Sequence, residues 1–288
     1  MPRPTHTIPR RPLARLLAIT ALASLMGAAT ASAHDFWIIP NLFAFPADAV
    51  IHINGRQGGG NFPAGTAVQP DRVVDARIIG ASSSTTIADM SVEGTSLRLL
   101  QKPAAAGQYL VVVGLAARVT RSTPAGVIRF LNAEGGAAEA ARLEREHTLA
   151  GLDSVIFTAA SYAATIAQVG AGGPRAFGKT AGLRLEFVPL NDPAHVHVGD
   201  TLHVKVLGNG APLRNIGVDL AAGVDSAASA PVTRIALNAD ANGIVHLPLS
   251  SAGPMMLRSA YASRKVGGAP NEWDVSRTTY VFNVGGKH

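Results

Sequence analysis

The chain contains no cysteine among its 288 residues, and aromatic residues make up only 5% of it. The first absence excludes disulfide bonds, thiolate metal ligands and a cysteine nucleophile. The second disfavours a stacking platform for sugars or nucleic-acid bases. The sequence also lacks the G-x-S-x-G and H-E-x-x-H patterns of hydrolytic enzymes. We therefore expect a binding protein rather than an enzyme, with a fold that depends on its hydrophobic core.

The first 33 residues have the three parts of a secretory signal peptide. A basic segment with four arginines and no acidic residue precedes an apolar run at 16–28, and Ala31-Ser32-Ala33 forms a small-x-small cleavage site. An uncleaved membrane anchor is the alternative, but the apolar run is short for a span of about 20 residues. We expect cleavage after Ala33 and a periplasmic protein that begins at His34.

The signal peptide carries most of the net charge. The whole chain has 25 Lys and Arg against 19 Asp and Glu, and four of the arginines lie in residues 1–33, which leaves 21 against 19, or +2. No concentrated basic stretch remains. The sequence therefore predicts no nucleic-acid partner.

Short β-type segments separated by Gly, Pro and Ser fill most of the mature chain. They predict an N-terminal β-sandwich domain over residues 34–120 and a C-terminal immunoglobulin-like or transthyretin-like sandwich over residues 181–288. Residues 121–180 predict a helical segment and a Gly-rich linker, with helices over 137–149 and 152–169. The expected fold class is mainly β, with two β-sandwich domains and a helical segment between them.

Residues Gly173 to Thr180 match the phosphate-binding pattern G-x-x-x-x-G-K-[ST]. Such a loop binds phosphate where it follows a strand and opens a helix, because the helix N-terminus supplies the amides. Here a β-type segment follows at 183–188. We therefore predict a flexible linker and no nucleotide partner.

The expected mature N-terminus is itself a candidate metal ligand. The free α-amine and the imidazole Nδ1 of His34 could close a chelate ring, and such nitrogen donors suit Ni(II), Co(II), Cu(II) and Zn(II). Asp35 could add a carboxylate or orient the imidazole. The alternative interpretation is a solvated, frayed chain end.

Other histidines could complete this site or form a second one. His52 lies on the polar face of a β-type segment and could be a second ligand if the N-terminal segment pairs beside it. His195 and His197 share one face of an extended segment, and His203 could join them. The alternative interpretation for each is an exposed histidine, and we expect the same of His246.

Four segments together resemble a known family: residues 34–38 (HDFWI), 182–193 (GLRLEFVPLNDP), 210–213 (GAPL) and 271–273 (NEW). They resemble the periplasmic nickel-transport-component family (NikK-like), exported proteins associated with nickel and cobalt uptake. The resemblance implies a β-sandwich binding protein near a membrane nickel/cobalt importer. It also implies that the metal is nickel or cobalt and that His34 is a ligand.

The chain departs from the family pattern at two places. Family members often carry a histidine in the strand matched here to Leu257–Tyr261, and basic residues in a helix matched to Ser161–Ala164. This chain has neither. A metal site that used those positions would be weakened or relocated, for example to His195 and His197.

The leading expectation is an exported periplasmic protein that binds a divalent transition metal, with nickel favoured and cobalt, copper or zinc as alternatives. Two other functions stay open. One is a copper-dependent oxidase or oxygenase with an N-terminal histidine brace, which His52 would complete. The other is a non-catalytic structural or adhesive sandwich domain.

Overall fold

The computed structural model describes residues 35–59, 62–223 and 234–287. The expected signal peptide and His34 lie outside the described residues. Residues 33–288 group into one compact unit, which is the part of the chain considered below. Its described residues are mainly β, so the fold class expected from the sequence is confirmed.

The described elements are strands of 2 to 16 residues, with two α-helices in the middle of the chain. In chain order they are β1 (Asp35–Pro40), β2 (Ala44–Phe45), β3 (Ile51–Gly58), β4 (Thr66–Ala67), the 3-10 turn η2 (Pro70–Arg72), β5 (Val73–Ile79), β6 (Ser84–Thr86), β7 (Asp89–Glu93), β8 (Ser96–Gln101), β9 (Gly107–Ser122), α2 (Pro124–Ala133), α3 (Ala137–Arg145), β10 (Val155–Val169), β11 (Leu185–Pro189), β12 (Thr201–Gly208), β13 (Ala211–Pro212), β14 (Gly217–Ala222), β15 (Arg234–Asn238), β16 (Ile244–Pro248), β17 (Gly253–Arg264) and β18 (Glu272–Val284).

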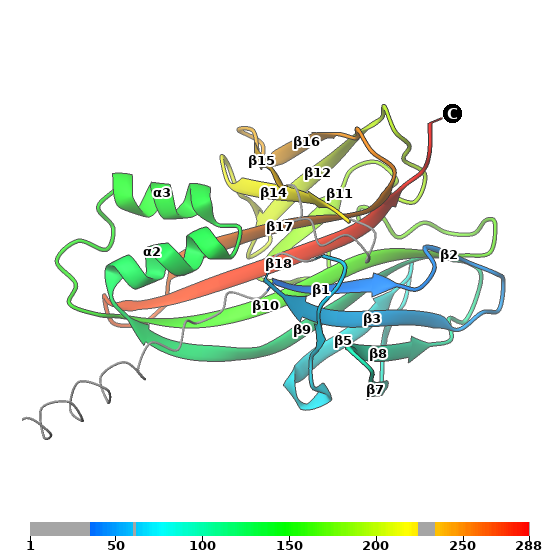
Figure 1. Cartoon of the computed structure of the whole chain (residues 1–288), viewed down its shortest axis with the longest axis horizontal. Coiled ribbons are helices and arrows are strands. Elements are labelled where there is room, and N and C mark those ends of the chain that lie inside the picture. The colour runs from blue at the N-terminus through cyan, green and yellow to red at the C-terminus, as the bar shows by residue number, and fades with distance from the viewer. Residues whose placement is uncertain (1–34, 60–61, 224–233, 288) are drawn as a thin grey trace, which may run out of the picture. The chain divides into compact units, whose positions relative to one another are not determined.

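One large sheet runs through the middle of this unit (Figure 1). Its strand order is β15-β14-β17-β18-β10-β9-β5-β6, and β2 also pairs with β10. β10 is antiparallel to β9 and parallel to β18. A smaller sheet of order β1-β3-β8-β7 and another of order β11-β12-β13 complete the described strands, with β4 and β16 added to them.

Two hydrophobic cores use opposite faces of the central strands. Along β9, Val111 and Val113 are buried in a core with β1, β3 and β8, whereas Val112 is buried in a core with β11, β12 and β16. Successive side chains of a strand point to opposite faces, so β9 is covered on both sides. This explains the apolar run at 110–113, since a strand buried on both faces needs no polar alternation.

The second helix expected from the sequence was wrong. Residues 155–169 form β10, which pairs along its whole length with β9, and the family-matched segment Ser161–Ala164 lies within this strand. The alanines of the segment suggested a helix, but its Val, Ile, Phe, Thr and Tyr residues favour a strand once neighbours cover both faces. Tertiary pairing therefore decides its structure.

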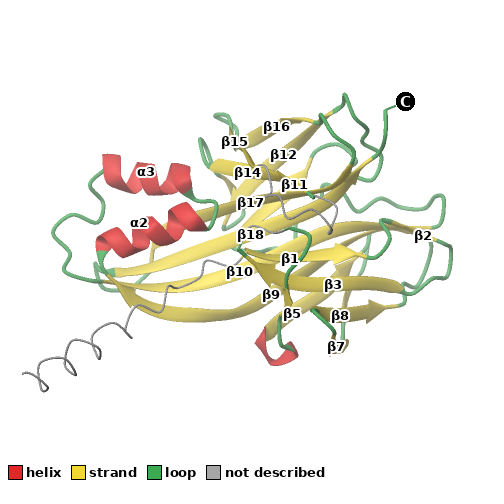
Figure 2. Cartoon of the chain, viewed as in Figure 1, coloured by secondary structure: helices red, strands yellow, loops and turns green. Residues whose placement is uncertain are grey.

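The other helix prediction is confirmed in part, because α3 spans Ala137–Arg145 and ends before residue 149. Sequence reasoning missed α2, which begins with Thr123 as N-cap and Pro124 in its first turn. Both helices pack on one end of the long strands (Figure 2). No helix among the described residues is long and apolar enough to cross a membrane.

Candidate functional site

A buried network of charges surrounds the first described residue. The carboxylate of Asp35 accepts hydrogen bonds from Arg258 Nη1, at 3.0 Å to each oxygen, and from Arg234 Nη2 at 3.0 Å. Arg258 also donates from Nε and Nη2 to Asp219 Oδ2, at 3.0 and 2.8 Å. Asp35 is therefore held by side chains of β15 and β17, two strands far from it in sequence, and Asp219 of β14 holds Arg258 in place.

The charges of this network compensate one another. Burial alone would lower the pKa of Arg258, but the carboxylates of Asp35 and Asp219 outweigh burial and raise it. Arg258 is thus a permanent cation between the buried carboxylate of Asp35 and the half-buried carboxylate of Asp219, and Arg234 supplies the second positive charge. Because its guanidinium occupies both oxygens of Asp35, that carboxylate serves as an anchor for the start of β1.

A second buried carboxylate, Glu134, lines the same small pocket as Asp35, Ser161, Arg258 and Arg277. Glu134 Oε2 pairs with Arg277 Nη1 at 2.5 Å, while its buried Oε1 has no hydrogen-bond partner among the described residues. Burial raises the pKa of Glu134, against the lowering effect of Arg277. An unpartnered carboxylate oxygen therefore lies in the pocket that Asp35 helps to form.

The strand register separates His52 from this pocket. β1 pairs with β3, and in this register Asp35 lies opposite Gly58 and Pro40 lies opposite Ile53. His52 lies six positions before Gly58 on this extended strand, which corresponds to about 20 Å at about 3.3 Å per position. In this register, pairing of β1 with β3 does not place His52 beside Asp35.

His195 and His197 line one pocket of about 410 Å³ at the far end of β18. His195 Nδ1 lies 2.9 Å from Asp192 Oδ2, and His197 is bridged to Gly285. The start of β1 contacts another part of β18: the hydroxyl of Thr279, six residues before Gly285, donates a hydrogen bond to the carbonyl of Phe36. These two points are about 20 Å apart, so the histidine pair and Asp35 belong to different sites.

Asp192 organises the pocket around the two histidines. Its Oδ1 accepts from Gln108 Nε2 at 2.7 Å, and its Oδ2 accepts from Arg175 at 2.9 Å. Burial alone would raise the pKa of Asp192, but hydrogen bonds from Ala194, Gln108 and His195 outweigh it and lower the pKa. The carboxylate is thus fully engaged in holding the loop that carries His195.

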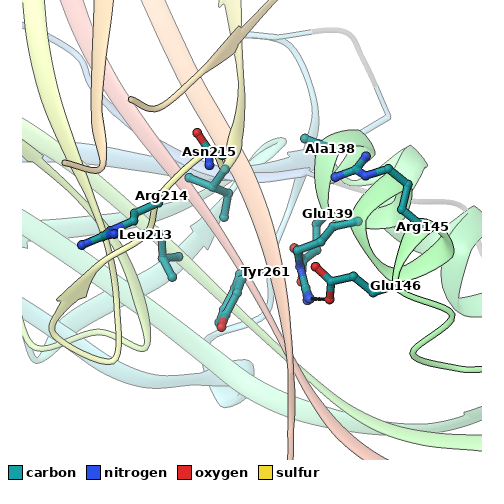
Figure 3. A pocket seen from close by; sticks show the side chains of 10 residues that line it. Ala138, Glu139, Arg145, Glu146, Leu213, Arg214, Asn215 and Tyr261 are labelled. Atoms are coloured by element: carbon teal, nitrogen blue, oxygen red, sulfur yellow. Dashed lines mark hydrogen bonds and ion pairs between the residues drawn. The ribbon is translucent and has the colours of Figure 1, made fainter. Parts of the chain in front are cut away.

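A third pocket, of about 390 Å³, lies between α3 and residues 213–216 (Figure 3). Arg142 bonds to Glu139 and Glu146, and Glu139 Oε1 also accepts from the backbone of Ala262. Hydrogen bonding to Glu139 raises the pKa of Arg142. This ion-pair network ties α3 to β17, so the lining is largely structural.

Sequence reasoning missed one pairing of histidines. His203 on β12 and His246 on β16 are directly opposite each other, and their Nδ1 atoms are 2.8 Å apart. The only sequence signal was that both lie on the polar face of alternating segments. Their pairing depends on the register of strands that 43 residues separate, which no local pattern gives.

The described residues do not by themselves supply a multi-ligand metal centre. Within residues 35–59, 62–223 and 234–287, no group of three or more His, Asp or Glu side chains is placed to hold a metal ion.

The family model described as a domain of unknown function, DUF4198, matches residues 31–263. The chain belongs to the DUF4198 family. The match covers Asp35, Glu134 and Arg258, and both members of the His203–His246 pair. A search of curated proteins gave no match for this DUF4198 chain.

Solved structures similar to the DUF4198 chain are distant. Alpha-2-macroglobulin from Escherichia coli is 10% identical, with 89% of this chain and 16% of that chain covered and a TM-score of 0.21. Murine CEACAM1b is 11% identical, with coverage of 88% and 100% and a TM-score of 0.20. The Escherichia coli adhesin FdeC is 14% identical, with coverage of 88% and 65% and a TM-score of 0.22. The chain thus spans about a sixth of the first of these proteins.

Proposed function

We propose that this DUF4198 protein is an exported, non-catalytic binding protein for nickel or cobalt. It captures the metal ion in the periplasm with the α-amine and imidazole of a mature N-terminal His34 and passes it to a membrane importer. The resemblance of residues 34–38 and 182–193 to nickel-transport components supports the choice of metal. The buried anchorage of Asp35 is the structural observation that carries the proposal.

The anchorage answers the main objection to a terminal metal site, which is that chain ends fray. Asp35 is buried and bonded to two arginines, and it is the first residue of a strand that pairs with β3. A ligand one residue earlier is covalently attached to this fixed point. Less conformational entropy is then lost when a metal binds.

The charge and hydrogen bonds of Asp35 and Glu134 determine which of the two carboxylates can bind the metal. Asp35 is neutralised by Arg258 and Arg234, so it positions the strand and does not ligate the metal. Glu134 Oε1, which has no partner among the described residues, is the proposed third donor beside the amine and imidazole. The α-amine has an ordinary pKa of about 8, so metal binding displaces a proton and the affinity rises with pH.

The two departures from the family pattern fall in this same pocket. Arg258 lies in the segment where family members often carry a histidine, and Ser161 lies in the segment that often carries basic residues. In this chain Arg258 binds Asp35, and Ser161 accepts a hydrogen bond from Arg277. The site then relies on His34 and Glu134, which predicts weak, reversible binding suited to transfer of the ion.

The histidine-brace oxidase gains no support from the structure. A brace needs a second histidine close to the N-terminal one. His52 lies about 20 Å along β3 from Gly58, the residue that pairs with Asp35.

The decisive experiment compares the processed protein with a version that carries one extra alanine before His34. The extension moves the free amine away from the imidazole and leaves every side chain in place. We expect Ni(II) affinity, measured by calorimetry at pH 7.5, to fall by at least tenfold. A matched variant, Glu134→Gln, is expected to weaken binding while keeping the amine. Equal affinities for the native and extended proteins would show that the N-terminus is not a ligand.

A further inference from the structure

His203 and His246 form a close imidazole pair on the solvent-facing side of the sheet formed by β11, β12, β13 and β16. They are directly opposite each other on the antiparallel strands β12 and β16. The N–H of His203 donates to Asn191 Oδ1, and its carbonyl accepts from Leu190 N, so neither group bonds to β16. Such non-hydrogen-bonded pairs have the shortest distance between facing side chains in an antiparallel sheet.

The rings meet through the same nitrogen. Nδ1 of His203 and Nδ1 of His246 are 2.8 Å apart, and the ring planes lie at 80° to each other. Two N–H groups cannot face each other at this distance, so one Nδ1 must present a lone pair to the proton of the other. The pair therefore holds one proton between two nitrogen donors that already converge.

A carboxylate lies at the other nitrogen of His246. Asp240 Oδ2 is 3.8 Å from His246 Nε2. Asp240 Oδ1 accepts hydrogen bonds from the backbone of Asn242 and Ile244, which fixes the side chain in the turn that leads into β16. A carboxylate at Nε2 favours a proton on that nitrogen and leaves Nδ1 as the lone-pair donor.

We propose that this pair is a second metal site, in which a divalent transition ion binds Nδ1 of His203 and Nδ1 of His246 while the proton shared by these two atoms moves through solvent to Nε2 of His203. Metal–nitrogen bonds of about 2.0–2.1 Å put two ligands of one ion about 3.0–3.4 Å apart, so the observed separation needs to open by only a few tenths of an ångström. The carboxylate of Asp240 lies on the Nε2 side of His246, opposite the proposed metal, where carboxylates commonly orient metal-bound histidines. Water completes the coordination, because His246 is exposed.

The donor set also predicts the metal preference. Two imidazoles with water ligands impose no rigid geometry, so affinity follows the general order in which Cu(II) binds more tightly than Ni(II), Co(II) or Zn(II). The site is therefore a low-coordination surface site with a preference for copper. It shares no residue with the N-terminal site proposed above and does not depend on it.

The test is a titration of the processed protein with Cu(II), followed by calorimetry and electron paramagnetic resonance. Native protein is expected to show a copper signal with nitrogen couplings from the histidine pair. His203→Gln and His246→Gln should each weaken this binding by at least tenfold, and Asp240→Asn by roughly 10–100-fold. His52→Gln is the matched control: it removes another strand histidine that faces Leu100 rather than a second histidine, and it should leave binding unchanged.

The alanine-extended protein separates the two sites. If the extension removes one copper equivalent and the double variant H203Q/H246Q removes another, both sites are present. Binding that is unchanged in the double variant, with its fold verified by circular dichroism, would overturn this inference. Loss in the double variant alone would support it and would count against the N-terminal site. In the intact protein, Zn(II) should shift the imidazole nitrogen resonances of His203 and His246, and unshifted resonances would also overturn the proposal.

Discussion

Arg258 directs a single nitrogen, Nη1, to both carboxylate oxygens of Asp35, at 3.0 Å each. The two residues are 223 positions apart in sequence, and both are buried. The contact fixes the beginning of β1 against the middle of β17. Because the proposed metal ligand directly precedes Asp35, we expect loss of this ion pair to lower both the stability of the protein and its affinity for the proposed metal.

Removal of the cation should be costly. Arg258→Met leaves the carboxylates of Asp35 and Asp219 without their main partner, and breaking a buried ion pair from one side costs about 3–5 kcal/mol. We expect a loss of that size in the free energy of unfolding, measured by urea denaturation. Arg98→Met, which breaks the exposed pair with Glu93, is the control and should cost less than about 1 kcal/mol. Similar losses in both variants would contradict the buried network.

The backbone conformation of the loop before β11 predicts how glycine-to-alanine substitutions at two adjacent positions change stability. Gly173 has φ +102°, and a Cβ there would lie 2.5 Å from the carbonyl oxygen of Ala106. Gly173→Ala should therefore destabilise the protein by at least about 1–3 kcal/mol. Gly172→Ala adds its Cβ to open space and should change the thermal midpoint little. Equal midpoints for the two variants would show that the loop is not held in this conformation.

The raised pKa of Glu134 predicts a dependence of stability on pH. A carboxyl group with a higher pKa in the folded state than in the unfolded state contributes stability at low pH, which is lost as pH rises through the folded pKa. Glu134→Gln does not titrate. The stability of the native protein relative to this variant should therefore fall between about pH 4 and the folded pKa. A difference that stays constant across this range in urea titrations would refute the assignment.

The buried, uncharged side chain of Gln108 should contribute strongly to the free energy of unfolding. Its Oε1 accepts from the backbone of Ala176 and Phe177, at 3.0 and 2.8 Å, and its Nε2 donates to Asp192. Gln108→Leu leaves two amides without an acceptor, each at about 1–3 kcal/mol. We expect a loss of about 2–4 kcal/mol in chemical denaturation. Gln101→Leu, at a half-buried glutamine whose side-chain amide donates to the neighbouring carbonyl of Lys102, should stay within about 0.5 kcal/mol.

Part of the fold follows from local sequence pattern. Alternation in segments such as 201–206 predicts strands with one face buried, and the structure places Leu202, Val204 and Val206 in the core. The pattern fails where neighbours cover both faces. Residues 155–169 do not alternate, and only their pairing with β9 and β18 shows that they form a strand.

The candidate sites follow less well from the sequence, because they depend on register. Asp35 is visible as a neighbour of the cleavage site, but its partners Arg258 and Arg234 are about 200 residues away. The sequence paired His195 with His197, which do line one pocket. It could not pair His203 with His246, since the alignment of β12 and β16 is set by the core residues on their other face.

The order of the strands along the chain also constrains when folding can finish. β18 comes last among the described strands, yet in the largest sheet it lies between β17 and β10. Its parallel partner β10 begins more than 100 residues earlier, with Ile156 opposite Glu272. Until residues 272–284 have been synthesised, β10 and β17 each lack a neighbouring strand, and the hydrogen bond from Thr279 to the carbonyl of Phe36 cannot form. The largest sheet is therefore complete only after the last described strand has joined it, and long-range pairings of this kind form slowly.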